Sequence, residues 1–189
     1  MYICKQLNFK DIPFVRSFFE KSYNINRNYI FQKRFLVYVF SVIYLSVAYS
    51  IILFSLTSPE MSQTLKHMSE SQLEELPNLN KPSFLAALVV LEFAFAEEII
   101  FRLGIQNYIQ KMLNLIDSQY WISISLTSLF WSFAHANVLD PEWVKIVQIF
   151  PIGLGLGYLF NKFGTEACIL AHGFFNIIMM FLTPYLFTI

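Results

Sequence analysis

Charged residues are scarce in this sequence. Only 14% of its 189 residues are Asp, Glu, Lys or Arg, whereas an ordinary soluble domain has about 25%. The 13 basic and 13 acidic residues give a formal net charge of zero, which argues against a nucleic-acid-binding protein with a basic surface. The 2 cysteines, Cys4 and Cys168, lack the paired spacing of a zinc site or of a disulfide-rich secreted domain.

Apolar residues, by contrast, exceed what the core of a soluble domain of this length requires. They make up 56% of the chain, which excludes a disordered protein and points to lipid. The stretch 35–56 carries no charge and is long enough for a membrane-spanning helix, which needs about 20 apolar residues. The next run follows Pro82 and Ser83, a pair typical of a helix start. The five expected hydrophobic helices are 35–56, 83–111, 120–136, 143–160 and 167–187.

These runs predict an all-α fold, namely a polytopic transmembrane helical bundle with about five membrane spans. The number of spans could change by one, to four or six, if a long helix breaks, for example near Gly104. Residues 1–34 are expected to form a cytoplasmic or interfacial segment, either as a short helix on the inner leaflet or as a loose tail. Residues 35–189 are expected to form the transmembrane bundle.

The distribution of charge predicts how the bundle is oriented. Basic residues outnumber acidic ones before residue 35, whereas the loop 57–82 is mainly acidic. Cytoplasmic segments of membrane proteins carry an excess of Lys and Arg. The N-terminus is therefore expected on the cytoplasmic side of a bacterial inner or plasma membrane.

Ionisable residues lie inside the apolar run 83–111. Each costs roughly 2.5–3.5 kcal/mol at the centre of a membrane-spanning helix, so it needs a partner or a function. Glu98 and Arg102 are four residues apart and fall on one helical face, where they are expected to form an ion pair. That pair is either part of a site or a device that fixes helix packing. Glu97 has no local partner and is a candidate site residue, while Glu92 has no assigned role.

Two of the 3 histidines also fall in apolar runs. His135 ends the third run, and His172 lies in the fifth run, one helical turn before Asn176. Two histidines, an unpaired carboxylate and an asparagine together indicate a site. Straight helices would leave His135 about 10 Å beyond the level of Glu97 and His172, since the rise is about 1.5 Å per residue. The site closes only if the helices tilt, break or start deeper.

Three motifs on these runs resemble those of one known family. They are EExxxR at residues 97–102, FxxxH at 131–135 with tryptophan in the first position, and HxxxN at 172–176. In this order they resemble the CPBP or Abi family, the CAAX-processing and bacteriocin-processing intramembrane endopeptidases, and in particular type II CAAX prenyl endopeptidases. The resemblance covers about residues 83–184. Trp131 replaces the expected phenylalanine, which we interpret as a change in packing only.

The resemblance implies a role for each motif residue in peptide-bond hydrolysis. Glu97 would act as the base that activates a water, and His135 would help to hold that water. His172 and Asn176 would donate hydrogen bonds to the carbonyl oxygen as it gains charge. The supporting residues, whose ion pair would keep the base oriented, are Glu98 and Arg102.

A zinc-dependent version of this site is the rival interpretation. Its ligands would be Glu97, His135 and His172. Asparagine is a poor zinc ligand and the HExxH motif is absent, so a mechanism without a cofactor is favoured over one that uses Zn2+. Cys168, one turn before His172, is expected to be a small buried core residue rather than the partner of a catalytic histidine.

The leading functional hypothesis is therefore an intramembrane endopeptidase that acts on a membrane-associated protein or peptide. The alternatives are a non-catalytic immunity or scaffold protein of the membrane, and a proton or ion carrier that uses the intramembrane carboxylates. The carrier is the weaker alternative because the chain has few spans and no inverted repeat. The expected partners are membrane lipid and a peptide or protein substrate, without nucleic acid. The substrate's identity and the oligomeric state stay open.

Overall fold

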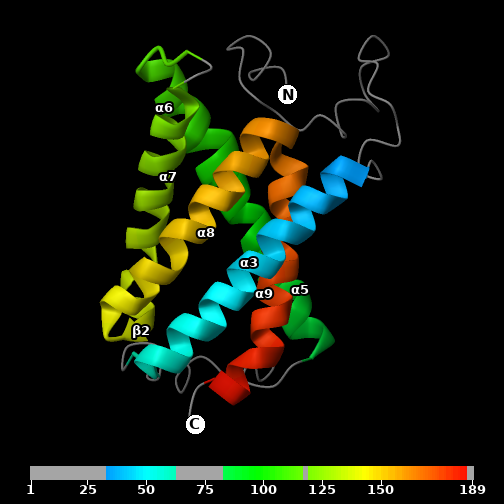
Figure 1. Cartoon of the computed structure of the whole chain (residues 1–189), viewed down its shortest axis with the longest axis vertical. Helices are drawn as coiled ribbons and strands as arrows, with labels where there is room; N and C mark the ends of the chain where they lie inside the picture. Colours follow the sequence, from blue (N-terminus) through cyan, green and yellow to red (C-terminus); the bar gives the residue numbers. More distant parts are fainter. Residues whose placement is uncertain (1–32, 63–82, 117–118, 187–189) are drawn as a thin grey trace.

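A computed structural model describes residues 33–62, 83–116 and 119–186. These segments are helical apart from short connections and one pair of two-residue strands, which confirms the predicted all-α class. Figure 1 shows the helices side by side, with α3 and α8 leaning relative to α7. Most of the predicted N-terminal segment, residues 1–32, lies outside the described residues, as does the acidic loop at 63–82.

The helices follow the order of the predicted apolar runs. Their bounds are α3 (Lys33–Thr57), α5 (Phe84–Glu97), the π-helix η1 (Glu98–Gln106), α6 (Asn107–Met112), α7 (Tyr120–Ala134), α8 (Glu142–Phe163) and α9 (Thr165–Leu186). The segments α5, η1 and α6 continue one another as a single rod. The rod does not break near Gly104, where it runs as a π-helix instead.

Three of these helices, α3, α8 and α9, are long and apolar enough to cross a membrane. The other two predicted spans contain shorter α-helical segments, because α7 has 15 residues and α5 has 14 before η1 begins. Large apolar side chains are exposed along the outer faces of the bundle, among them Phe40, Tyr44, Phe84 and Phe93. Such a surface suits lipid rather than water, so the chain is a membrane protein.

The sequence specifies where two of the helices begin. Ser83 caps α5, since its hydroxyl oxygen accepts a hydrogen bond of 3.1 Å from the backbone N–H of Ala86, as the predicted helix start requires. Helices α8 and α9 are joined through Gly164, whose φ of 88° lies in the region that favours glycine. This short connection brings the end of α8 directly to the start of α9.

Glycines on α8 allow α7 to pack closely against it. A Cβ atom on Gly157 would lie 2.7 Å from Cγ2 of Ile124, and one on Gly153 would lie 2.8 Å from Cβ of Ser128. The Ser128 hydroxyl donates to the carbonyl of Ile124, four residues earlier on α7, so the polar group is satisfied within its own helix. Small residues of this kind are typical of helix–helix contacts in membranes.

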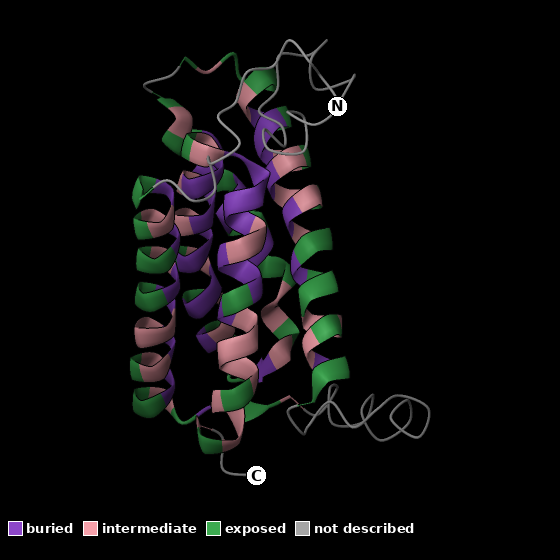
Figure 2. Ribbon diagram, turned by 90° about the vertical axis from the view of Figure 1, so that its right-hand side faces the viewer, coloured by how far each residue is buried: buried purple, intermediate pink, exposed green. Residues whose placement is uncertain are grey.

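The main core lies between α3, α7, α8 and α9. Its buried members are Phe35, Val39, Ile43, Trp131, Ile149, Ile152, Leu156, Leu159, Phe160, Ala167, Cys168, Ala171 and Phe175. Figure 2 shows that buried residues gather toward the end of the bundle at which α8 meets α9. At the opposite end the second core cluster is smaller and consists of Phe54, Leu139 and Val144.

A pair of very short strands closes that opposite end. Strand β1 (Glu60–Met61) pairs antiparallel with β2 (Leu139–Asp140), so the chain after α3 is tied to the connection between α7 and α8. The same connection contains the 3₁₀ turn η3 (Ala136–Val138) and begins at His135. The strand pair, which was not predicted, thus holds the segment that carries this histidine.

Candidate active site

Three helices bring the predicted site residues together. Glu97 is the last residue of α5, His135 caps the C-terminal end of α7, and His172 lies two turns into α9. The separation of about 10 Å that straight helices would impose on His135 is not observed. The Nε2 atom of His135 lies 3.6 Å from Oε1 of Glu97, and His172 is close enough to Glu97 to interact with it electrostatically.

Glu97 and His135 form the accessible pair of the site. Their side chains are 25% and 23% exposed, so the pair is not enclosed by the protein. The distance of 3.6 Å between them is too long for a direct hydrogen bond. Nδ1 of His135 lies 2.9 Å from the backbone carbonyl oxygen of Trp131 and donates to it, because a carbonyl only accepts. Nε2 is therefore the ring nitrogen that faces Glu97.

Glu98, Arg102 and His172 form the buried triad. The Oε1 atom of Glu98 accepts a hydrogen bond of 2.9 Å from Nδ1 of His172, and Oε2 lies 3.3 Å from Nε of Arg102. All three side chains are at most 4% exposed. The predicted ion pair between Glu98 and Arg102 is thus confirmed, whereas the bond from Glu98 to His172 was not predicted.

The π-helix η1 explains why this triad is buried. Its enclosed residues are Glu98, Arg102 and Gln106, which follow one another at intervals of four. A π-helix forms i→i+5 hydrogen bonds and has a wider turn than an α-helix, so residues four apart stay close to one face. Gln106 donates to the carbonyl oxygen of Gly157 at 3.2 Å, which ties the far end of this polar face to α8.

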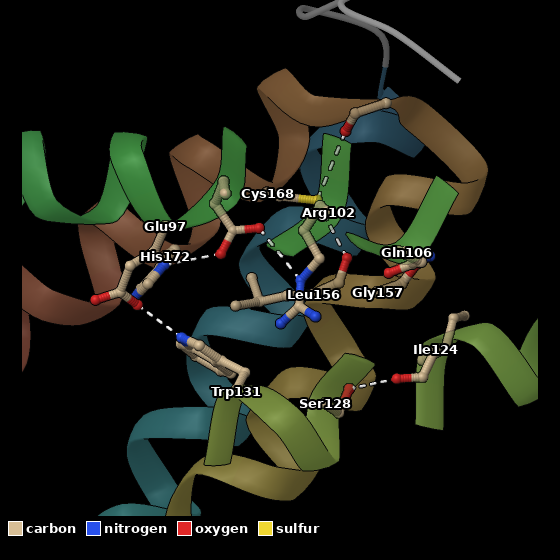
Figure 3. A network of polar contacts seen from close by, with 12 residues as sticks. Glu97, Arg102, Gln106, Ile124, Ser128, Trp131, Leu156, Gly157, Cys168 and His172 are labelled. Carbon is tan, nitrogen blue, oxygen red and sulfur yellow. Dashed lines mark hydrogen bonds and ion pairs between the residues drawn. The ribbon is translucent and has the colours of Figure 1, made fainter. Parts of the chain in front are cut away.

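The guanidinium of Arg102 is only partly engaged by the protein. Its carbon Cζ lies 5.1 Å from the centre of the Trp131 ring, within range of a cation–π interaction. Its Nη1 and Nη2 atoms are buried and have no hydrogen-bond partner among the described residues. Figure 3 shows the guanidinium directed toward the space between Trp131 and Leu156.

Asn176 and Glu92 are not drawn into this network. Asn176 is half-buried on α9, one turn beyond His172, and its side chain forms no hydrogen bond with any residue of the described segments. Glu92 is exposed on α5. Glu92 thus lies outside the site. The side-chain amide of Asn176 lies one turn from His172, and its N–H groups are not used by any described residue.

Trp131 is a site residue that the sequence analysis missed. Its indole N–H donates a hydrogen bond of 2.7 Å to Oε2 of Glu97 (Figure 3), so the interpretation of this tryptophan as a change in packing only is wrong. A buried indole N–H usually finds a partner, and the change from phenylalanine to tryptophan inside a motif was the signal available.

Lys145 also lies closer to the site than its sequence position indicated. Its ammonium donates to Oε1 of Gln148 at 2.8 Å, and Gln148 in turn donates to the Ser50 hydroxyl at 2.9 Å. Lys145 interacts electrostatically with Glu97, which adds a positive charge to the surroundings of the accessible pair. A lysine three residues into an apolar helix was the only signal in the sequence.

The cysteine within the described segments belongs to the core. Cys168 is fully buried, and its thiol contacts the carbonyl oxygens of Leu156 at 3.1 Å and Gly164 at 3.6 Å. The prediction of a small core residue is therefore confirmed, and the thiol is bonded away from His172.

The donor atoms do not form a metal site as they are arranged. Within residues 33–62, 83–116 and 119–186, no three His, Cys, Asp or Glu side chains are grouped so that they could bind one metal ion. Nδ1 of His172 is directed to Glu98, and Oε2 of Glu97 is occupied by Trp131.

Comparison with known proteins places the site in a family. A family model described as Type II CAAX prenyl endopeptidase Rce1-like matches residues 79–178, a range that contains all three motifs. The chain is also 27% identical over 124 residues to the sporulation-killing factor biosynthesis protein SkfC of Bacillus subtilis (strain 168). This match covers 65% of the chain but only 22% of that protein's length. No solved structure matches the chain. Since the family model spans more than half of the sequence, the chain belongs to the Rce1-like family of type II CAAX prenyl endopeptidases.

Proposed function

We propose that this chain is an intramembrane endopeptidase that hydrolyses a peptide bond of a membrane-associated protein or peptide. The observation that carries the proposal is the approach of Glu97, His135 and His172 from three helices, inside the segment that matches an endopeptidase family. The accessible position of Glu97 and His135 supports a reaction at this pair, because both water and substrate must reach it.

The first step is the activation of water by Glu97. Oε1 of Glu97 accepts a hydrogen from the water, and Nε2 of His135 accepts the other when the ring carries its proton on Nδ1 alone. The two atoms lie 3.6 Å apart without a direct hydrogen bond, so the water is placed beside both of them. The water oxygen then attacks the carbonyl carbon of the substrate. As the new C–O bond forms, one proton passes to Glu97 and the electron pair of the carbonyl bond moves to the carbonyl oxygen.

Donors on α9 stabilise the resulting oxyanion. The side-chain amide of Asn176 has N–H groups that no described residue uses. His172 contributes through Nε2, since its Nδ1 already donates to Glu98. Donation from both ring nitrogens requires the imidazolium form of His172.

Collapse of the intermediate completes the hydrolysis. The carbonyl bond re-forms, the C–N bond breaks, and the leaving amine takes the proton that Glu97 received from water. The products are a carboxylic acid and an amine, so atoms and charge balance without a cofactor. Glu98 and Arg102 support the reaction by holding His172 rather than by touching the substrate.

The charge distribution supports a cytoplasmic position for the N-terminal end of α3. Basic residues collect at this end of the bundle, namely Lys33, Arg34, Lys111 and Lys162, while Glu60, Asp140 and Glu142 lie at the other end. The proposed orientation therefore follows the positive-inside rule in a bacterial inner or plasma membrane. The name of the Bacillus relative links that protein to the biosynthesis of a killing factor, so a bacteriocin precursor is one substrate class that we propose for this chain.

The test compares wild-type protein with Glu97→Gln and with Glu92→Gln. Membranes from cells that express each protein are searched by mass spectrometry for new peptide termini. Loss of the base should reduce cleavage by about 10²–10⁴-fold, and Glu92→Gln should keep it, because Glu92 is exposed on the same helix outside the site. Cleavage that persists in Glu97→Gln at equal protein level contradicts the proposal. Proton uptake into liposomes that depends on Glu97, without cleavage, would favour a carrier instead.

A further inference from the structure

The indole of Trp131 lies at the centre of the site. Its side chain is 1% exposed, and its ring meets those of His135 and His172 edge-on, with centroid distances of 5.4 Å and 5.2 Å. The Arg102 guanidinium lies 5.1 Å from the centre of the same ring. Trp131 therefore contacts both the accessible pair and the buried triad, and its position is fixed by packing on several sides.

This fixed ring makes one directed contact with the proposed base. The N–H···O distance of 2.7 Å between Trp131 and Oε2 of Glu97 is at the short end for a hydrogen bond to a carboxylate. Because Oε2 is engaged by the indole, Oε1 is the oxygen that faces His135. One donor thus decides which carboxylate oxygen is available to water.

The Trp131 bond is the shortest polar contact of the Glu97 carboxylate among the described residues. Glu97 sits at the end of α5, and α5 packs against α9, while α7 packs against α8 and η1. The Trp131 bond therefore ties α7 to the rod at the junction of α5 and η1, where the proposed base lies. A phenylalanine at this position would keep an aromatic ring near both histidines but would leave Oε2 without its donor.

We propose that Trp131 is a positioning residue whose indole N–H holds Oε2 of Glu97, so that Oε1 faces His135 and the attacking water. This inference rests on the proposed function for its effect on rate, but the hydrogen bond itself can be tested without any activity. Without the bond the carboxylate can rotate about its side-chain torsions. Misplacement of a reacting group by about 1 Å costs on the order of 100-fold in rate.

The kinetic experiment uses Trp131→Phe, with Trp121→Phe as the matched control. Trp121 lies near the other end of α7 and is 45% exposed. We expect kcat to fall by about 10- to 100-fold in Trp131→Phe with KM changed by less than about twofold, and Trp121→Phe to behave as wild type. Unchanged kcat in folded Trp131→Phe overturns the proposal, as does a rise in KM that accounts for the whole loss.

If Trp131→Phe does not fold, β-(3-benzothienyl)-alanine at position 131 removes only the donor. This analogue replaces the indole N–H by sulfur at nearly the same volume, so packing around both histidines is retained. It should lower kcat as Trp131→Phe is expected to do. Full activity with the analogue overturns the proposal.

The spectroscopic experiment detects the bond directly. The chain has 3 tryptophans, so ¹⁵N-indole labelling gives three N–H resonances, and the one lost in Trp131→Phe is that of Trp131. This resonance should lie downfield and move upfield in Glu97→Gln, because an amide oxygen is a weaker acceptor than a carboxylate. A resonance that does not respond overturns the positioning role. A resonance that responds in a protein without peptidase activity leaves the bond in place and rejects the proposed function instead.

Discussion

Two adjacent carboxylates on one helical rod have opposite surroundings. Glu97 ends α5 beside His135 with a quarter of its side chain exposed, whereas Glu98 begins η1 and is enclosed between Arg102 and His172. Neighbouring residues of a helix do not share a face, so a one-residue step separates the opening of the site from its interior. The pair of identical side chains therefore divides into one that is partly exposed and one that is enclosed by its ionic partners.

The division has a physical cost that only the buried triad carries. A charge that is removed from water loses several kcal/mol of solvation, and a partner must compensate for this loss. Glu98 contacts His172 at 2.9 Å and Arg102 at 3.3 Å. Glu97, by contrast, is partly exposed and has a single short hydrogen bond, from Trp131. Substitutions in the triad should therefore act on stability, and substitutions in the accessible pair should act on rate.

Removal of the positive charge of Arg102 should have the largest effect on stability. Arg102→Met leaves the Glu98 carboxylate buried with His172 alone to compensate, so we expect the free energy of unfolding to fall by about 3–5 kcal/mol. Glu97→Gln should change it by less than about 1 kcal/mol, because that side chain is accessible. Denaturant unfolding in detergent, followed by circular dichroism, measures both variants.

The double variant Glu98→Gln/Arg102→Met separates loss of a pair from loss of packing. With both charges of the ion pair removed, most of the stability should return, since the Glu98 carboxylate is no longer left buried without Arg102. If Arg102→Met unfolds at the same denaturant concentration as Glu97→Gln, the predicted difference in stability between the buried triad and the accessible pair is wrong.

Substitution of the accessible histidine should have the next largest effect, and this effect should be on rate alone. His135→Gln replaces the imidazole by a flexible amide that does not hold the attacking water in the same place, so kcat should fall by about 100-fold while the unfolding midpoint stays unchanged. His172→Gln is the comparison, because it breaks the bond to Glu98 and should lose both activity and stability. Assays of peptide cleavage and of unfolding on the same preparations give the answer. Equal destabilisation by the two substitutions would contradict the division.

Local patterns in the sequence were sufficient for the helices and for one ion pair. Uncharged apolar runs and the cap at Ser83 placed the helices, because burial in lipid and capping depend on nearby residues. The spacing of Glu98 and Arg102 predicted their contact, since both lie on one helical face. Motif order indicated which three helices would meet at Glu97, although nothing in the sequence measured the distance.

The contacts between residues on different helices could not be predicted from local sequence patterns. The bond from His172 to Glu98 joins residues 74 positions apart, and the donor at Trp131 reaches Glu97 across 34 positions. The π-helix was missed because its residues also suit an α-helix, and tertiary packing selects between them. Straight helices drawn from the ends of the apolar runs would leave His135 about 10 Å from the level of Glu97, whereas its Nε2 atom lies 3.6 Å from Oε1 of Glu97.

Removal of metal should have the smallest effect, and it tests whether the two groups are separate at all. A zinc ion bound by Glu97, His135 and His172 would join the accessible pair to a member of the buried triad. In the arrangement described, Nδ1 of His172 donates to Glu98 and Oε2 of Glu97 accepts from Trp131, so each group is complete by itself. We therefore expect cleavage to change by less than about twofold after dialysis against EDTA or addition of 1,10-phenanthroline, with a known zinc peptidase as the control. Loss of activity that added zinc restores, together with one zinc per chain by elemental analysis, would contradict the glutamate mechanism. It would also mean that His172 serves the reacting centre through a metal, so that stability and rate could no longer be altered independently.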